Sequence, residues 1–201
     1  HGPDAIAGFR GTMNYSNLVA NHLLPEWLAC LGSTSFFSTM TIDQSAKWVT
    51  FERLGGWAAG RDPLATADVL LWIGTNPLVS LSTFNFDLQH PVQRLRDAKA
   101  RGLKLIVIDP RKTAAGRFAD IWVQLRPGTD TALLMAWINV IIEEGLYDKE
   151  FVEEWTFGFD ELRARAAEYT PERVADITWV SPDVIRESAR MYATNRPAGC
   201  R

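Results

Sequence analysis

The most informative part of the hydrophobic pattern is one short apolar run near the middle of the chain. Leu103 to Ile108 is almost entirely aliphatic and runs directly into Asp109, Pro110 and Arg111. A short apolar run bounded by turn residues is typical of a strand buried on both faces, as in parallel sheets. Proline ends such a strand because it has no N–H to donate. We therefore expect Asp109 and Arg111 just beyond the carboxyl end of a central strand.

The same analysis predicts the other elements. An apolar run before Gly74 and a shorter one before Arg126 predict two further strands, the second following the central strand without an intervening helix. Apolar residues at helical spacing, with capping residues at the ends, predict helices between and after them. The predicted strands are 67–73, 103–108 and 118–125, and the main predicted helices are 17–31, 46–54, 91–101 and 131–144.

This order of strands and helices with short links predicts an α/β fold. We expect a doubly wound, mainly parallel, Rossmann-like sheet of about four to six strands with flanking helices and a helical C-terminal part. The predicted organisation is a single α/β domain over 1–201. Within it we expect an N-terminal segment at 1–45, a nucleotide-binding core at 67–145 and a helical extension at 146–201.

Composition and charge narrow the function without identifying it. Hydrophobic residues make up 47% of the chain and charged residues 22%, as in an ordinary globular domain. The net charge of −3 argues against a nucleic-acid partner. The eight tryptophans are expected to pack in the core or in interfaces.

The two cysteines give no metal-site motif, and the start of the chain suggests a piece of a larger protein. Cys30 and Cys200 form no CxxC pair, so no zinc or iron–sulfur motif is present in this segment. No apolar run is long enough for a membrane span, and no leader-like segment is visible. The chain starts at His1 without a methionine, so we expect a fragment. Its compartment stays open, with the cytoplasm as the default.

Three predicted strand ends carry similar turn residues. In a parallel sheet these ends meet at one edge, where open α/β sheets bind ligands. Glycine lets backbone N–H groups approach phosphates, a carboxylate accepts from ribose hydroxyls or a guanine edge, and a guanidinium binds a phosphate with two hydrogen bonds. The sequence thus predicts a nucleotide site. The three turns are Gly74-Thr75-Asn76-Pro77, Asp109-Pro110-Arg111-Lys112-Thr113 and Pro127-Gly128-Thr129-Asp130.

Each of these residues also has a purely structural interpretation. Asn76 and Asp130 are good helix N-caps, and Asp109 with Arg111 could form a surface ion pair. The chain contains no GxGxxG sequence, which weighs against an ordinary dinucleotide-dependent dehydrogenase.

The sequences of the three turns, in this order and spacing, resemble those of the molybdopterin oxidoreductases, the dimethyl sulfoxide reductase family. The likeness covers roughly 41–193 and continues through Glu144-Gly-Leu-Tyr147-Asp148 and Tyr169-Thr-Pro171-Glu172. It implies one α/β domain of a larger catalytic subunit that binds bis-molybdopterin guanine dinucleotide with molybdenum or tungsten. It also implies that the other domains of that subunit, and an electron-transfer subunit, are possible partners. Any iron–sulfur cluster would lie in other parts of the parent protein.

The resemblance also implies roles for individual residues. The first turn would line the phosphate side of the cofactor, the second would bind the nucleoside and its phosphate, and the third would face the guanine, with Asp130 as the guanine-binding carboxylate. These cofactor-binding residues are Gly74, Thr75, Asn76, Asp109, Arg111, Gly128, Thr129 and Asp130.

The metal ligand implied by the resemblance comes from a loop well before Gly74. Here that loop is 41–47, where Asp43 is the expected catalytic metal ligand and Ser45 the alternative, since oxygen ligands suit a hard metal. Asp43 could instead cap the following helix. The chain departs from the family at Trp179, where a glycine is expected in the Ile-Thr-Gly-Val turn. That departure leaves the shape of the turn open.

Overall fold

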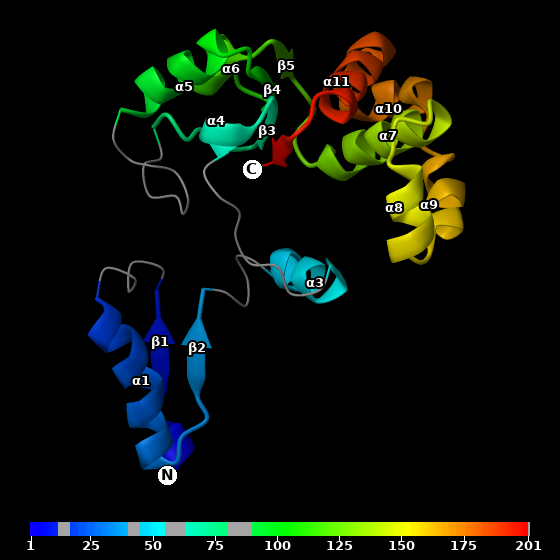
Figure 1. Cartoon of the computed structure of the whole chain (residues 1–201). Coiled ribbons are helices and arrows are strands. Elements are labelled where there is room, and N and C mark those ends of the chain that lie inside the picture. The colour runs from blue at the N-terminus through cyan, green and yellow to red at the C-terminus, as the bar shows by residue number, and fades with distance from the viewer. Residues whose placement is uncertain (12–16, 40–44, 55–62, 80–89, 201) are drawn as a thin grey trace. The chain divides into compact units, whose positions relative to one another are not determined.

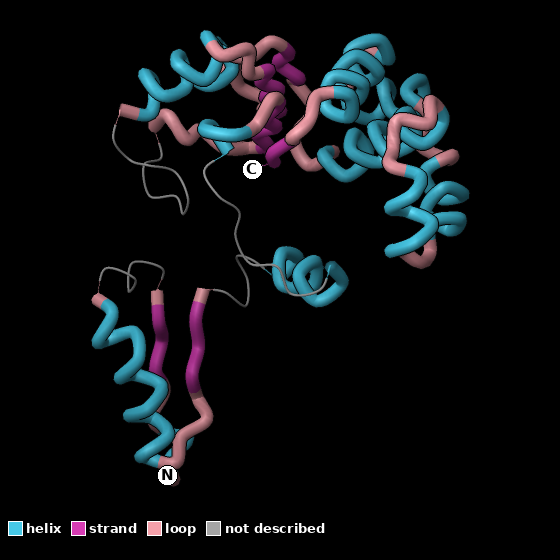
Figure 2. Tube along the Cα trace, viewed as in Figure 1, coloured by secondary structure: helices cyan, strands magenta, loops and turns pink. Residues whose placement is uncertain are grey.

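The computed structural model describes residues 1–11, 17–39, 45–54, 63–79 and 90–200. The chain divides into two compact units, His1–Ala59 and Gly60–Arg201, and each is described by itself. Figure 1 labels most of their elements, and Figure 2 distinguishes helices from strands.

The first unit places a helix against a pair of short parallel strands. Asn17 caps this helix by accepting a hydrogen bond from the Ala20 N–H at 3.1 Å, and Gly32 ends it in the left-handed conformation at φ 76°. Gly8 lets helix and strand approach closely, because a Cβ there would lie 2.7 Å from Leu28 Cδ1. The elements are η1 (Pro3–Ala5), β1 (Gly8–Arg10), α1 (Leu18–Leu31), β2 (Phe36–Ser38) and α3 (Ser45–Leu54).

The second unit is built on a four-stranded, fully parallel sheet in the order β5-β4-β3-β6. The chain winds from β3 through β4 to β5 and then returns to place β6 beside β3, as in doubly wound sheets. The predicted fold class is confirmed. The elements are α4 (Pro63–Thr66), β3 (Val69–Ile73), α5 (Pro91–Ala100), β4 (Lys104–Ile108), α6 (Ala114–Phe118), β5 (Ile121–Val123), α7 (Asp130–Glu143), α8 (Lys149–Trp155), α9 (Phe159–Ala166), α10 (Pro171–Thr178), α11 (Pro182–Thr194) and β6 (Ala198–Cys200).

Helices cover both faces of this sheet (Figure 2). Leu70 and Leu105 face a cluster that includes Leu95 of α5, whereas Val69 and Ile106 face a cluster built with α7, α10 and α11. Alternate residues of a strand point to opposite faces, so a strand between two helical layers must be apolar throughout. This explains the unbroken apolar runs in β3 and β4.

The second unit departs from the sequence prediction before and after its last predicted strand. The helix α6 lies between β4 and β5, where a direct link was expected; parallel neighbours need such a crossover, because a tight turn cannot join them. The C-terminal part is helical up to Thr194, as predicted, and then adds β6, which pairs with Val69–Leu71. Three residues that include Gly199 give too weak a strand pattern to be found from sequence.

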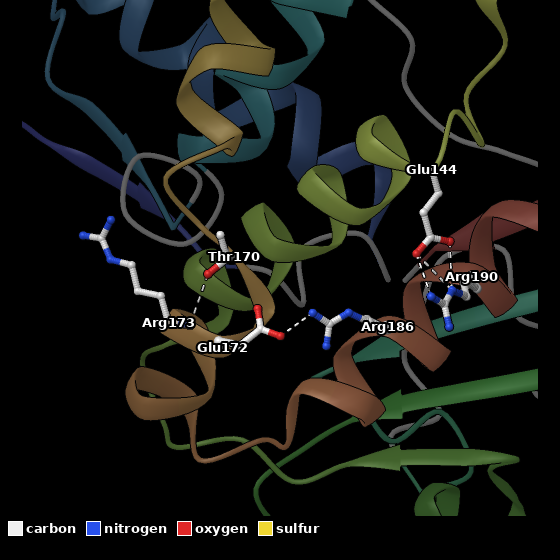
Figure 3. Close-up of polar contacts among 6 residues, drawn as sticks. All are labelled: Glu144, Thr170, Glu172, Arg173, Arg186 and Arg190. Carbon is white, nitrogen blue, oxygen red and sulfur yellow. Dashed lines mark hydrogen bonds and ion pairs between the residues drawn. The ribbon is translucent and has the colours of Figure 1, made fainter.

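Ion pairs tie the helices on one side of the sheet to each other (Figure 3). Arg190 of α11 binds the Glu144 carboxylate with two hydrogen bonds, at 2.7 Å from Nη2 and 2.8 Å from Nε, and Arg186 contacts Glu172 of α10. The hydrogen bonds from Arg190 hold the pKa of Glu144 below its ordinary value. These pairs are exposed, so they fix orientation more than they add stability.

Asp120 joins α5, β4 and β5 at the amino end of the sheet. Its Oδ2 accepts from Lys99 Nζ at 2.6 Å and from the Leu105 N–H at 2.7 Å. Partial burial alone would raise the pKa of Asp120, but these hydrogen bonds and the nearby lysine charges outweigh it and leave the pKa below its ordinary value. The carboxylate is thus more favourable in the folded than in the unfolded chain.

We expect Asp120→Ala to lower the free energy of unfolding by about 1 kcal/mol at pH 7, since the Leu105 N–H loses its partner at a partly exposed site. Because the folded-state pKa is depressed, this contribution is present above the unfolded-state pKa and is lost as pH falls through the folded-state value. Urea unfolding at pH 7 and at about pH 3 measures it, with the exposed Asp97→Ala as control. An equal loss at both pH values would contradict the assignment.

Candidate functional site

The carboxyl ends of three strands lie level at one edge of the sheet. Ile73 pairs with Ile108, and Ile108 pairs with Val123, so β3, β4 and β5 stop at the same height. The Gly74 N–H donates to the Ile108 oxygen at 2.9 Å, which holds the first two turns together as the chain leaves the strands. The first two predicted turns therefore begin side by side at this edge.

The turn after β3 has an open backbone and an unpaired acceptor. Gly74 has a φ of 58°, and beyond its chain neighbours no atom of the described residues lies within 4 Å of where a Cβ would stand, so a ligand can approach its backbone. Asn76 Oδ1 is buried and accepts no hydrogen bond from the described residues. The Val79 N–H donates to the Asn76 oxygen at 3.0 Å, which closes a turn. Within the described residues Asn76 begins a turn and caps no helix, while residues 80–89 lie outside them.

The turn after β4 is held by hydrogen bonds to its backbone. Asp109 Oδ1 accepts from the Arg111 N–H at 2.8 Å, and Trp122 Nε1 donates to the Asp109 oxygen at 3.0 Å. The Arg111 side chain is exposed and forms no ion pair with Asp109, so the surface-pair interpretation does not describe this turn. The fold thus leaves the Arg111 guanidinium available at the edge of the sheet.

Thr113 is a polar residue of this turn that sequence analysis did not single out. It is only 7% exposed and precedes α6 at the N-cap position, yet its side chain makes no capping bond. Its Oγ1 is buried without a partner among the described residues. A buried hydroxyl without a partner is destabilising, and native proteins rarely retain one. Its sequence signal was its place at the end of the turn after the central strand, since the helix α6 that follows it was not predicted.

The third turn leads into α7. Arg126 accepts two hydrogen bonds at its backbone oxygen, from Thr129 Oγ1 at 2.6 Å and from the Thr129 N–H at 3.3 Å, and Gly128 has a φ of 82°. Asp130 is the first residue of α7 and is partly buried. The N-cap of this helix is Thr129, so the interpretation of Asp130 as the cap is wrong. Asp130 is instead an acid in the first helical turn.

The metal-ligand candidates belong to the first unit. Asp43 lies outside the described residues, and Ser45 is the exposed first residue of α3. Within the ranges described, no three His, Cys, Asp or Glu side chains come together in a way that could hold a metal ion.

Comparison with known proteins shows the family to which the chain belongs. A family model for molybdopterin oxidoreductases matches residues 1–195. The chain belongs to the molybdopterin oxidoreductase family. The predicted resemblance is confirmed, and membership implies a pterin cofactor that carries molybdenum or tungsten.

Individual members of the family show how much of a complete protein this chain represents. Formate dehydrogenase H of Escherichia coli is 37% identical over 203 residues, which cover 98% of this chain and 27% of that protein. Acetylene hydratase of Syntrophotalea acetylenica is 50% identical over 137 residues, 67% of this chain and 18% of that protein. The chain therefore spans about a quarter or less of these two relatives.

The solved structure of acetylene hydratase from Pelobacter acetylenicus has the same fold. The TM-score is 0.82 at 36% identity, and the match covers 98% of this chain and 26% of that one. Among the described residues, every helix is too short or too polar to span a lipid bilayer.

The chemistry of the residues at the sheet edge suits a phosphate-bearing ligand. Asn76 supplies an unpaired acceptor and Thr113 an unpaired hydroxyl, while the open backbone at Gly74 admits a phosphate. The second turn adds two cationic side chains, those of Arg111 and Lys112. The Lys112 ammonium lies 5.2 Å from the centre of the Trp122 ring. Donors, acceptors and positive charge thus occur together at this edge of the molybdopterin oxidoreductase domain.

We expect Thr113→Val to leave the free energy of unfolding unchanged or raised, because it removes a buried hydroxyl that has no partner. The matched control is Thr178→Val, since the Thr178 hydroxyl is fully buried but donates to the Val174 oxygen at 2.8 Å. That variant should lose about 1–2 kcal/mol. Urea unfolding of both measures the difference. Equal losses would mean that the Thr113 hydroxyl has a partner after all.

Proposed function

We propose that this chain is part of a molybdenum or tungsten oxidoreductase that uses a bis-molybdopterin guanine dinucleotide cofactor. In this proposal the second unit binds the guanosine-phosphate arm of one pterin at the carboxyl edge of its sheet. The observation that supports it best is the pair of buried, unpaired polar atoms, Asn76 Oδ1 and Thr113 Oγ1, beside level strand ends.

In this proposal each of the three turns binds a different part of the nucleotide. The backbone of Gly74 and Thr75, with Asn76, lines the phosphate side of the cofactor. Arg111 pairs with a phosphate through its exposed guanidinium, and the Asp109 carboxylate accepts from the nucleoside, since only its Oδ1 is engaged by the Arg111 N–H. The bond from the Arg111 N–H fixes the Asp109 carboxylate against the turn before the nucleotide arrives.

The third turn binds the guanine. Gly128 leaves its backbone open, with no atom within 4 Å of where a Cβ would stand. Thr129 closes the turn through its bonds to the Arg126 oxygen. The Asp130 carboxylate can accept from both N–H donors of the guanine edge, which adenine lacks in that arrangement.

The redox chemistry belongs to the cofactor, which when bound supplies oxygen-atom or hydride-equivalent transfer. The residues of this chain hold and orient it. Asp43 provides an oxygen ligand to the metal, and Ser45 is the alternative. The other domains of the same polypeptide complete the site, and an electron-transfer subunit is a further partner. A similar protein of Methanocaldococcus jannaschii is named as the alpha subunit of an F420-dependent formate dehydrogenase, in line with such an assembly.

The full-length parent protein, produced in a host that makes the pterin, tests the proposed function. After acid hydrolysis we expect about two guanine nucleotides for each molybdenum or tungsten atom, because the cofactor carries one guanosine on each of two pterins. Elemental analysis and nucleotide chromatography measure the ratio. A folded protein with neither metal nor guanine would favour a nucleotide-binding scaffold without a redox centre.

We expect Asp43→Ala in the full-length enzyme to abolish turnover while the guanine content stays unchanged, since the ligand holds the metal and the sheet edge holds the nucleotide. Ser45→Ala is the matched variant and should keep most of the activity. Activity with an artificial electron donor, together with metal and guanine content, provides the readout. A fully active Asp43→Ala enzyme would exclude Asp43 as the ligand, and an inactive Ser45→Ala enzyme would transfer the role to Ser45.

A further inference from the structure

Trp179 adopts a backbone conformation that side chains other than glycine rarely accept. It follows α10 with φ 65° and ψ 15°, and its N–H donates to the Ala175 oxygen at 2.9 Å. The turn thus keeps the left-handed shape that a glycine would give it, although a bulky residue is strained there. Trp179 is also 71% exposed, so packing in this domain does not compensate for the strain. Such outliers point to a function of the side chain.

The Trp179 indole lies beside the third turn of the candidate site. The Arg126 guanidinium carbon is 5.3 Å from the centre of the indole ring, and the Arg126 N–H donates to the Thr178 oxygen at 2.8 Å. The Thr129 bonds to the Arg126 oxygen then fold the chain tightly from Arg126 to Asp130. Trp179 and the residues proposed to face the guanine are therefore tied together by backbone hydrogen bonds.

We propose that Trp179 is a stacking surface for the planar base of the nucleotide bound at this edge, an inference that rests on the proposed function. An exposed indole ring offers a π-face to a purine, and stacking on an aromatic side chain is a common way to hold a base. Arg126 lies over the ring and helps to fix its orientation. Trp179 supplies the contact with the face of the base, while Asp130 binds its edge.

Replacement by glycine separates a binding role from a structural one. Glycine accepts the left-handed conformation without strain. The melting temperature of Trp179→Gly should therefore equal that of the wild type or exceed it by about 2 °C. The same variant should weaken binding of the base by about tenfold, because the stacking partner is gone. Trp179→Phe keeps an aromatic face and should bind within about threefold of the wild type.

The experiment uses the full-length protein from a host that cannot assemble the pterin, titrated with GDP by calorimetry. Asp130→Asn serves as the control for the proposed function, since an amide cannot accept from both guanine N–H donors. Weaker GDP binding by Trp179→Gly, with an unchanged or higher melting temperature and near-normal binding by Trp179→Phe, supports the proposal.

The remaining outcomes overturn it in distinguishable ways. Binding that Asp130→Asn loses but Trp179→Gly keeps would exclude stacking while leaving the proposed function intact. A lower melting temperature for Trp179→Gly with normal GDP affinity would show that the indole packs against another part of the protein. A wild-type protein that binds no GDP would remove both the nucleotide site and the stacking role.

Discussion

Burial of β3 and β4 on both faces is the constraint on which the rest of the second unit depends. Leu70 and Leu105 pack against one helical layer while Val69 and Ile106 pack against the other, so neither strand can turn a face to solvent. A shift of one residue in register would exchange the two sets of side chains, which fixes the pairing. The level strand ends follow from that register, and they bring the turns at Gly74 and Asp109 together.

Much of this arrangement was predictable because the apolar runs are long and end in distinctive residues. The run before Asp109 identified the central strand, and the glycines at the ends of α1 and α5 marked where these helices stop. Two of the elements that were missed in the second unit, α6 and β6, are five and three residues long. They are too short to show a period, and the sheet requires them only once its topology is known. Their existence depends on tertiary contacts rather than on local sequence.

The sequence predicted which residue types form the candidate site, but it could not predict which of their polar atoms are hydrogen-bonded within the protein. Glycines and carboxylates at strand ends suggested a nucleotide, which stays a prediction, whereas the family match implies a pterin cofactor with molybdenum or tungsten. The Thr113 hydroxyl, which has no partner among the described residues, could not be found from the sequence. The helix α6 that follows it was not predicted, so nothing marked Thr113 as an N-cap position. The sequence presented Asp130 as a cap, and the structure places it inside the helix. Only the fold reveals which polar atoms are already used.

Three residues in the turns after β3 and β4, or in a turn beside the candidate site, destabilise the fold locally. Asn76 and Thr113 each bury a polar atom that has no partner in the part of the chain that the structure describes, and Trp179 holds a strained backbone with an exposed ring. The Trp137 Nε1 is also buried without a partner among the described residues, but it lies in the core, where the large apolar ring offsets the loss of one hydrogen bond. No such gain is present for the other three. Sequences keep local conflicts of this kind where a function requires them, so their position supports the ligand proposed for the carboxyl edge.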